Sequence, residues 1–273
     1  MAVTAVSNVS FNIQDVVSSI VTEELVQSAV LLPSIMDRSG EVGIGMDRLS
    51  IPRFDALTLQ AVSETAEVVA QTITGAQSEL VLNQHFSYPF AIGDKVMSQS
   101  KADLVSEAVR NGAKVHAAGI DNYLLGLMAA AGTQLDFSAS AVNDITQARN
   151  QLNKFNSMMG DRYLVVSPDY ESLILRENSF INAEKYGSAQ AVQAGEIGRL
   201  FGFTVLVSNS AAIPAGGFIA YHKSSTHFAR QIAPKFETER KVLAHRDEYS
   251  LSQLYGGICV DDSLERIIVF NAP

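Results

Sequence analysis

The chain has 273 residues, with 29 acidic and 20 basic side chains and a formal net charge of −9. Charged residues make up 18% of the chain and hydrophobic residues 47%, whereas an ordinary soluble domain carries about 25% charged residues. No window reaches the roughly 18 consecutive apolar residues that a membrane span requires, so the apolar surplus must be buried within protein. This length allows one large domain or two ordinary ones.

The N-terminus lacks the pattern of a secretory signal. It has no basic segment, since no Lys or Arg precedes Arg38, and it has no continuous apolar run. The single cysteine, Cys259, cannot form a disulfide within the chain. It lies in the apolar run 257–260, which predicts a buried and unreactive thiol.

Charge is unevenly distributed along the chain. Residues 1–100 hold four basic and eleven acidic side chains, and 54–94 contain no Lys or Arg. Residues 221–247 hold six basic and three acidic side chains, with three of the five histidines. The acidic end and the base-rich segment could attract each other within one chain or between copies, or they could be two solvated faces.

The first third of the chain predicts a helix followed by extended structure. Apolar residues at helical spacing over 11–32, ended by Pro33, indicate an amphipathic helix. Residues 57–74 are typical of a strand, Gly75 and Ala76 of a turn, and the alternation over 80–90 of a second strand. Together these segments predict a long β-hairpin with few charges and no obvious core of its own.

A long helix is predicted from Ser98 to about Ala131, where no proline occurs. At 1.5 Å per residue it would be about 50 Å long, which suits an architectural spine. Its predicted apolar stripe consists of Leu104, Ala108, Val115, Ala118, Leu125 and Met128. Gly112, Gly119 and Gly126 recur every seven residues and would permit close approach of a neighbouring element, although small residues at helix contacts are common.

The remainder predicts a mixed α/β lobe and then short strands. Over 141–223, helices are expected at 142–155 and from Pro168, and strands at 163–166, 204–207 and 218–221. The last region predicts strands at 228–232, 249–255 and 266–270.

Motifs for nucleotide binding and nucleophilic catalysis are missing from the sequence. There is no G-x-x-x-x-G-K-[ST] and no G-x-S-x-G, and the Gly-rich stretches at 40–45 and 195–202 do not connect a strand to a helix as a dinucleotide fingerprint does. Cys259 has no catalytic signature around it. The sequence therefore predicts no catalytic residue, no cofactor-binding residue and no enzymatic activity.

Metal and nucleic-acid sites are not predicted either. The five histidines are His85, His116, His222, His227 and His245. They form no H-E-x-x-H motif, and none pairs with a nearby cysteine. The adjacent carboxylates at 23–24 and 261–262 diverge from each other, so they are poor acid/base pairs. A net charge of −9 without a basic stripe argues against sequence-specific nucleic-acid binding.

The order of these elements resembles the major capsid protein family of tailed double-stranded DNA phages, which has the Hong Kong 97 fold. The matching stretches are residues 49–53, Asp121 in the long helix, residues 195–205, and residues 247–249 with the strands through Val269 and Phe270. The resemblance covers nearly the whole chain and implies an α+β fold with an N-arm, an E-loop hairpin, a P-domain and an A-domain. The implied boundaries are 1–48 for the N-terminal arm, 49–94 for the E-loop hairpin, 95–140 for the P-domain spine helix, 141–223 for the A-domain and 224–273 for the P-domain strands.

The resemblance implies a structural protein that self-assembles through pentamers and hexamers into an icosahedral shell around double-stranded DNA. It further implies a portal, a separate scaffolding protein and a possible decoration protein as partners, with assembly in the bacterial host cytoplasm and a final location in the virion. Some members crosslink an E-loop lysine to a neighbouring subunit, but 54–94 contain no lysine, so that chemistry is not expected. No inserted domain of obvious size interrupts the lobe.

Three other classes remain open. An encapsulin nanocompartment shell shares the fold and the approximate length, although the chain contains no tryptophan and so lacks the tryptophan-containing N-terminal pattern usual in encapsulins. An α/β enzyme would need a converging set of titratable groups. A tail or decoration component would lack the long spine helix.

Overall fold

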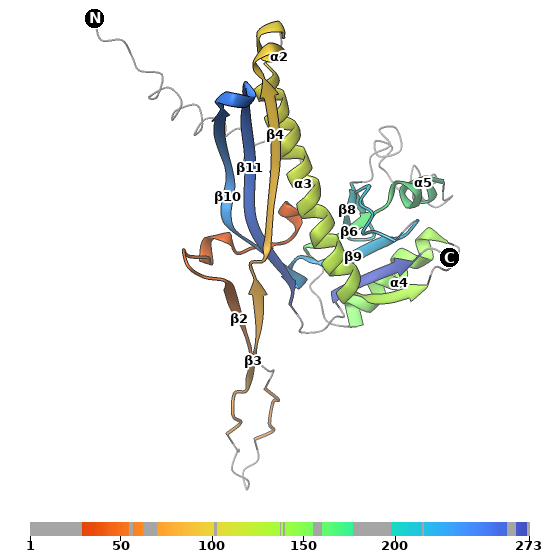
Figure 1. The fold of residues 1–273 in the computed structure, drawn as a ribbon. Helices are drawn as coiled ribbons and strands as arrows, with labels where there is room; N and C mark the ends of the chain where they lie inside the picture. The colour runs from red at the N-terminus through yellow and green to blue at the C-terminus, as the bar shows by residue number, and fades with distance from the viewer. Residues whose placement is uncertain are drawn as a thin grey trace, which may run out of the picture.

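The computed structural model describes residues 29–54, 57–62, 70–100, 103–136, 138, 140–154, 160–176, 198–214, 216–260 and 266–271. In this part of the chain a long sheet lies beside one long helix, a compact lobe lies on the other side of that helix, and a narrow hairpin projects away from both (Figure 1). The predicted α+β composition is confirmed.

The long sheet has four strands, in the order β1 (Met36–Asp37), β10 (Thr226–Lys241), β11 (Arg246–Cys259) and β4 (Gln84–Gly93). β10 and β11 pair antiparallel from Thr226↔Cys259 to Lys241↔Arg246, and β11 pairs antiparallel with β4. The short turn η5 (Val242–Ala244) joins β10 to β11, and His245 takes a left-handed conformation with φ 48°. β1 runs parallel to β10.

The spine helix α3 (Leu104–Ala131) has 28 residues and is therefore about 42 Å long. Its predicted end at Ala131 is confirmed, but the predicted start at Ser98 is wrong. A separate helix α2 (Asp94–Gln99) comes first, and Ser100 is extended. The break arises because Asp103 caps α3 by accepting the Ser106 N–H at 3.2 Å.

The buried face of α3 differs from the predicted stripe. Leu125 and Met128 are buried as expected, but Val115 is 50% exposed. The buried face is instead made by Val109, Gly112, Ala113, His116, Ala117, Ile120, Asp121, Leu124, Leu125 and Met128. Two polar residues interrupt this stripe, so its periodicity is not visible in hydrophobicity alone. Of the three regularly spaced glycines, only Gly112 lies against another element.

The lobe is built on a six-stranded sheet with two helices. The strand order is β5 (Thr133–Asp136), β12 (Ile267–Asn271), β9 (Phe218–His222), β6 (Arg162–Val166), β8 (Phe203–Val207) and β7 (Arg199–Leu200). The helices α4 (Ala141–Lys154) and α5 (Pro168–Arg176) pack on it through Ile145, Leu152 and Tyr170. The predicted helices and strands of 141–223 are confirmed within the described residues. β12, expected among the terminal strands of the P-domain, instead lies between β5 and β9.

The hairpin consists of β2 (Arg48–Phe54) and β3 (Gly75–Val81), paired from Arg48↔Val81 to Phe54↔Gly75. The predicted turn at Gly75 and Ala76 is wrong, because both residues belong to β3. The alternation over 80–90 also covers two strands, since the chain leaves the hairpin after Val81 and β4 joins the four-stranded sheet.

The N-terminal helix predicted over 11–32 lies mostly outside the described residues. The described residues at its end do not continue a helix: Leu31 is followed by the short 3₁₀ turn η1 (Leu32–Ser34), in which Pro33 lies near the start. Leu31 and Ile35 are buried in the core that α3 shares with the lobe.

Candidate assembly surfaces

The segment that follows residue 28 is fixed to its own subunit through Asp121 of α3. The two carboxylate oxygens of Asp121 accept the backbone N–H groups of Val30, at 2.9 Å, and Leu31, at 3.2 Å. Burial raises the pKa of Asp121, and the two hydrogen bonds offset part of that effect. The residue singled out in the helix by sequence thus serves as an anchor for the arm.

A second anchor lies three residues after Leu31, at Ser34. Ser34 Oγ lies 2.5 Å from the hydroxyl oxygen of Tyr221 in β9, and both side chains are buried. Burial raises the pKa of Tyr221, so its hydroxyl stays protonated. The arm segment therefore joins the spine helix and the lobe within one chain.

The stretch 247–249 ties the sheet together at its distal end. Arg240 donates to both oxygens of Asp94, at 2.5 and 2.6 Å, and to Asp247 at 3.0 Å. The ring of Tyr249 stacks on Phe90, with centroids 4.9 Å apart. At least part of the base-rich segment is thus paired with acidic residues of its own chain.

The other matched stretches are structural as well. Residues 49–53 form most of β2. In the described part of 195–205, Phe201 (φ 49°) and Gly202 (φ 88°) turn the chain between β7 and β8, and Gly198 accepts the Val205 N–H at 3.2 Å. Residues 195–197 lie outside the described part.

The hairpin has a covered base and an exposed distal half. At its base, Leu49, Ile51, Leu80 and Leu82 cluster with Ala229 of β10, so the expectation that it has no core applies only further out. Beyond β2 and β3, Leu57 is 54% exposed, Leu59 103%, Val62 85% and Ile73 64%. Large apolar side chains exposed together on a projecting element are typical of an interface.

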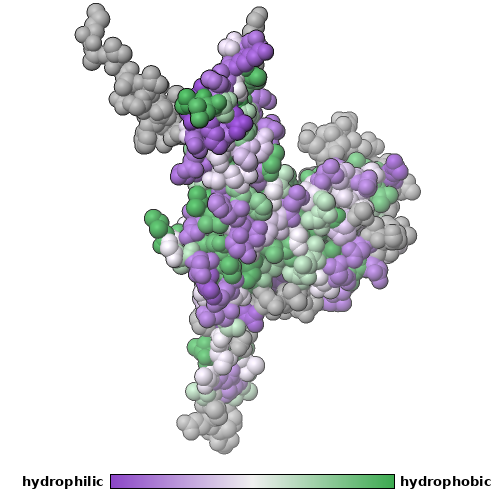
Figure 2. Space-filling model, in the orientation of Figure 1, coloured by the Kyte–Doolittle hydropathy of each residue, from purple (hydrophilic) through white to green (hydrophobic). Residues whose placement is uncertain are grey.

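The opposite end of the molecule carries a second apolar surface. Val242 and Leu243 of η5 are 67% and 99% exposed, and Val96 and Met97 of α2 are 55% and 42% exposed. Figure 2 shows hydrophobic residues at both ends of the elongated body. The paired strands and the Arg240 bridges hold this distal tip in shape without covering it.

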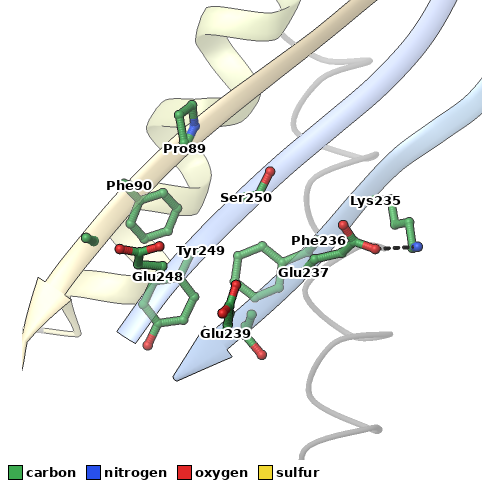
Figure 3. Close-up of a pocket in the computed structure, with 11 residues that line it drawn as sticks. Pro89, Phe90, Lys235, Phe236, Glu237, Glu239, Glu248, Tyr249 and Ser250 are labelled. Carbon is green, nitrogen blue, oxygen red and sulfur yellow. Dashed lines mark ion pairs between the residues drawn. The ribbon is translucent and has the colours of Figure 1, made fainter. Parts of the chain in front are cut away.

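The open face of the four-stranded sheet contains a groove of about 940 Å³, lined by β4, β10 and β11. Figure 3 shows its carboxylates, which come from Glu237, Glu239 and Glu248. Glu239 lies directly opposite Glu248 across the strand pair, whereas Lys241 and Arg246 pair with Glu248 at 2.6 and 2.7 Å. Lys235, which also lines the groove, pairs with Glu237 at 2.5 Å, so two of the three carboxylates are in ion pairs.

The histidines are not brought together. His116 lies between α3 and β11, donating from Nε2 to the Leu251 carbonyl at 3.0 Å and accepting from Gln253 at 2.9 Å. His222 Nδ1 contacts Ser224 and His227 Nδ1 contacts Arg38, so their partners differ. Among the described residues no three His, Cys, Asp or Glu side chains are grouped to hold a metal ion.

Cys259 is half-buried, with its Sγ 3.8 Å from Thr226 Oγ1. Burial raises the pKa of its thiol to about 11, so the group is protonated at neutral pH. The paired carboxylates at 23–24 and 261–262 lie outside the described residues. No described helix is long and apolar enough to cross a membrane.

The contacts missed by sequence reasoning are those of Asp121, Tyr221 and His227 with the arm segment. The detectable signal was the occurrence of His116 and Asp121 within an otherwise apolar face of the spine helix. A buried polar residue needs a partner. The partners of Asp121 are Val30 and Leu31, which lie about ninety residues away in the chain, and no local spacing indicates them.

The long spine helix, the sheet beside it, the lobe and the projecting hairpin define an α+β shell subunit with the Hong Kong 97 fold. The solved structure "Mycobacterium phage Che8" has a TM-score of 0.75 and 23% identity, covering 89% of this chain and 91% of that one. "Capsid structure of the Cyanophage P-SCSP1u" has a TM-score of 0.72 and 14% identity, covering 88% and 86%. These likenesses establish the fold.

The chain belongs to the phage capsid protein family, whose model, described as phage capsid protein, matches residues 86–262. The same fold occurs in "Crystal structure of virus-like particle from Pyrococcus furiosus", with a TM-score of 0.64 and 10% identity over 94% of this chain and 98% of that one. A comparison with curated protein sequences gives no match.

Proposed function

We propose that many copies of this chain assemble into the closed icosahedral head shell of a tailed phage, around double-stranded DNA. The observation that carries the proposal is the exposed apolar half of the hairpin, on a chain of the phage capsid family. Those side chains have no cover among the described residues of their own subunit. A neighbouring copy would provide it.

The proposed roles follow the parts of the fold. The hairpin and the arm overlap neighbouring subunits, and the lobe lines the axes of five- and six-membered rings. If the hairpin buries on the order of 500 Å² against a neighbour, the gross gain at about 25 cal/mol per Å² is roughly 12 kcal/mol before ordering costs. Such a contact is large enough to decide whether a shell holds together.

The proposed domain division is 1–48, 49–94, 95–140, 141–223 and 224–273, and the sheet topology suggests two adjustments to it. β4 is grouped with the four-stranded sheet rather than with the hairpin. β12 is grouped with the lobe. The hairpin proper is then β2, β3 and the residues between them.

We propose no catalytic role for the chain, and we expect it to have no catalytic, cofactor-binding or metal-binding residues. The proposed partners are other copies of the chain, a portal, a separate scaffolding protein and a possible decoration protein. Assembly would take place in the host cytoplasm, and the finished shell would be part of the virion. Contact with the enclosed DNA would not depend on base sequence, since the chain is acidic overall.

A nanocompartment shell is the second candidate, and the likeness to the Pyrococcus furiosus virus-like particle favours it. Such a shell would enclose protein rather than a genome. The family match to phage capsid proteins favours the first candidate.

The test is to express the protein with and without the neighbouring genes that encode candidate scaffolds, and to follow assembly by light scattering and negative-stain microscopy. Closed shells are expected. A monomer or dimer under every condition would contradict the proposal. Extraction of nuclease-protected nucleic acid from particles purified from infected cells distinguishes the two candidates, because the phage head holds DNA and the nanocompartment holds protein cargo.

A further inference from the structure

The link between the arm anchor and the hairpin is attached to the sheet by very few contacts. β1 has only two residues, which pair with His227 and Phe228 of β10. The backbone N–H of Arg38 donates to the Phe228 carbonyl at 2.8 Å. A strand this short depends on side-chain contacts for its position.

Ser39 Oγ accepts the Arg230 backbone N–H at 3.0 Å, and a further side-chain contact is a hydrogen bond between two residues that can both carry positive charge. Arg38 Nε donates to His227 Nδ1 at 2.7 Å, while Arg38 Nη1 donates to the two oxygens of Glu41 at 2.8 and 3.0 Å. The guanidinium is always protonated and has no acceptor. The bond therefore requires a neutral His227 with a free lone pair on Nδ1.

The surroundings of His227 favour this neutral form. Its side chain is 5% exposed, and burial, followed by the positive charge of Arg38, lowers the pKa of its imidazole. The Ser224 backbone and the carboxylate of Glu41 act in the other direction, as smaller causes. The residue opposite it on β11 is Ile258, which carries no charge.

We propose that protonation of His227 releases residues 36–41 from β10. A proton on Nδ1 removes the acceptor and brings two cations within hydrogen-bonding distance in a site that water reaches poorly. The Arg38 side chain must then leave, and its bond to His227 no longer fixes β1. The Asp121 anchor persists, because a neutral carboxyl is less costly to bury and still offers a carbonyl oxygen.

Release at this point would loosen the link between the arm anchor and the hairpin. Residues 36–41 lie between the anchored arm segment and β2, which begins at Arg48. Gln231 of β10 holds the intervening turn by donating to the carbonyls of Gly43 and Met46, at 3.2 and 2.7 Å. The release itself concerns a single subunit, and only its effect on a shell rests on the proposed function.

Amide hydrogen exchange of the purified protein, corrected for the intrinsic pH dependence of exchange, tests the proposal at pH 7.5, 6.5 and 5.5. Protection of the Arg38 amide should fall with pH, by up to about tenfold per pH unit between the pKa of the free and the docked imidazole. In His227→Asn, whose amide oxygen replaces Nδ1 but cannot be protonated, protection should stay constant. The matched control His222→Asn should behave like the wild type.

Constant protection in the wild type, or an equal fall in His227→Asn, would overturn the proposal. If His227→Asn does not fold, Arg38→Leu provides a second test. Without the arginine charge, the amides of residues 35–37 should lose protection at every pH equally, and a retained pH dependence would count against the mechanism. None of these outcomes depends on whether shells form.

Discussion

Gly112 marks the closest approach of the spine helix to the sheet. A Cβ at this position would lie 2.8 Å from Tyr88 Cδ1 and 3.3 Å from Leu251 Cδ2. Gly112→Ala should therefore lower the free energy of unfolding by about 1–3 kcal/mol, measured by urea denaturation. Its matched control is Gly119→Ala on the same helix, where nothing lies within 4 Å.

The control should change stability in the opposite direction. Alanine is favoured over glycine in a helix interior by about 1 kcal/mol, so Gly119→Ala should stabilise the protein slightly. Equal effects at the two positions would show that the contact with Tyr88 does not limit the packing of α3 against the sheet.

Asp121 provides a second prediction at the level of single residues. Asp121→Ala leaves the N–H groups of Val30 and Leu31 without their acceptor, at a cost of about 1–3 kcal/mol. Asp121→Asn keeps one oxygen and removes a costly buried charge, so it should cost less. Urea denaturation measures both, and the Leu31 amide should lose protection in Asp121→Ala. A larger loss in Asp121→Asn would contradict the anchoring role.

Asp121 and His116 also show what sequence reasoning could not supply at this scale. The sequence predicts a long helix with one buried face, and the structure has that helix. Hydrophobic periodicity placed part of the face on the wrong residues, because the true face includes a charged and a titratable side chain. Only the fold supplies their partners, Val30, Leu31 and Leu251.

At the scale of elements, the hairpin gives the sharpest test. The double variant Leu57→Ser, Leu59→Ser should leave the free energy of unfolding of the subunit within about 0.5 kcal/mol, because both side chains are exposed. Assembly should fail or shift to higher protein concentration, as seen by light scattering and microscopy. The matched control Gln60→Ser, in the same segment, should assemble normally.

Unchanged assembly of the double variant would remove these side chains from the proposed interface. A subunit that no longer folds would show instead that they are covered within their own chain. The two results are told apart by circular dichroism of the unassembled variant.

The hairpin shows why element boundaries were harder to predict than element types. A charge-poor hairpin was expected and is present, but the strand predicted over 57–74 is wrong: the described residues of that range form no strand, and the hairpin strands are β2 and β3. The turn was misplaced because glycine and alanine at 75 and 76 are typical of a turn by residue type. In the structure both residues pair with β2, and the register of the two strands is fixed by that pairing and by the cluster at Ala229. The step from β3 to β4 has little local signal either, since only Gln84 interrupts the apolar residues that occupy every second position from Leu80 to Phe90.

At the scale of the whole molecule, stability should depend on pH through three histidines, of which His116 and His227 are buried and His222 is half-buried. Burial is the main cause that lowers the pKa of His116, His222 and His227. The unfolded chain then binds more protons than the folded one below the ordinary histidine pKa of about 6.5. Stability is fully present above that value and is lost as the pH falls.

Urea denaturation at pH 7.5 and 5.5 should accordingly show a lower midpoint at the acidic pH. The raised pKa of Asp121 acts in the opposite sense, because protonation relieves its burial cost. Repeating the comparison with Asp121→Asn removes that contribution and should leave the histidine effect. A midpoint that is constant or higher at pH 5.5 in this variant would contradict the assignment.

The position of β12 has a consequence for how the subunit is made. Thr133 pairs with Ile268 and Phe218 with Phe270, so the middle of the lobe sheet waits for residues synthesised long after its first strand. Until residues 267–271 leave the ribosome, β5 and β9 present unpaired edges that are open to other chains. The nascent lobe is therefore exposed to misassociation during translation. Only chains whose synthesis has passed residue 271 can complete the lobe sheet, so the yield of correct subunits should follow the number of chains that are finished rather than the number that are started.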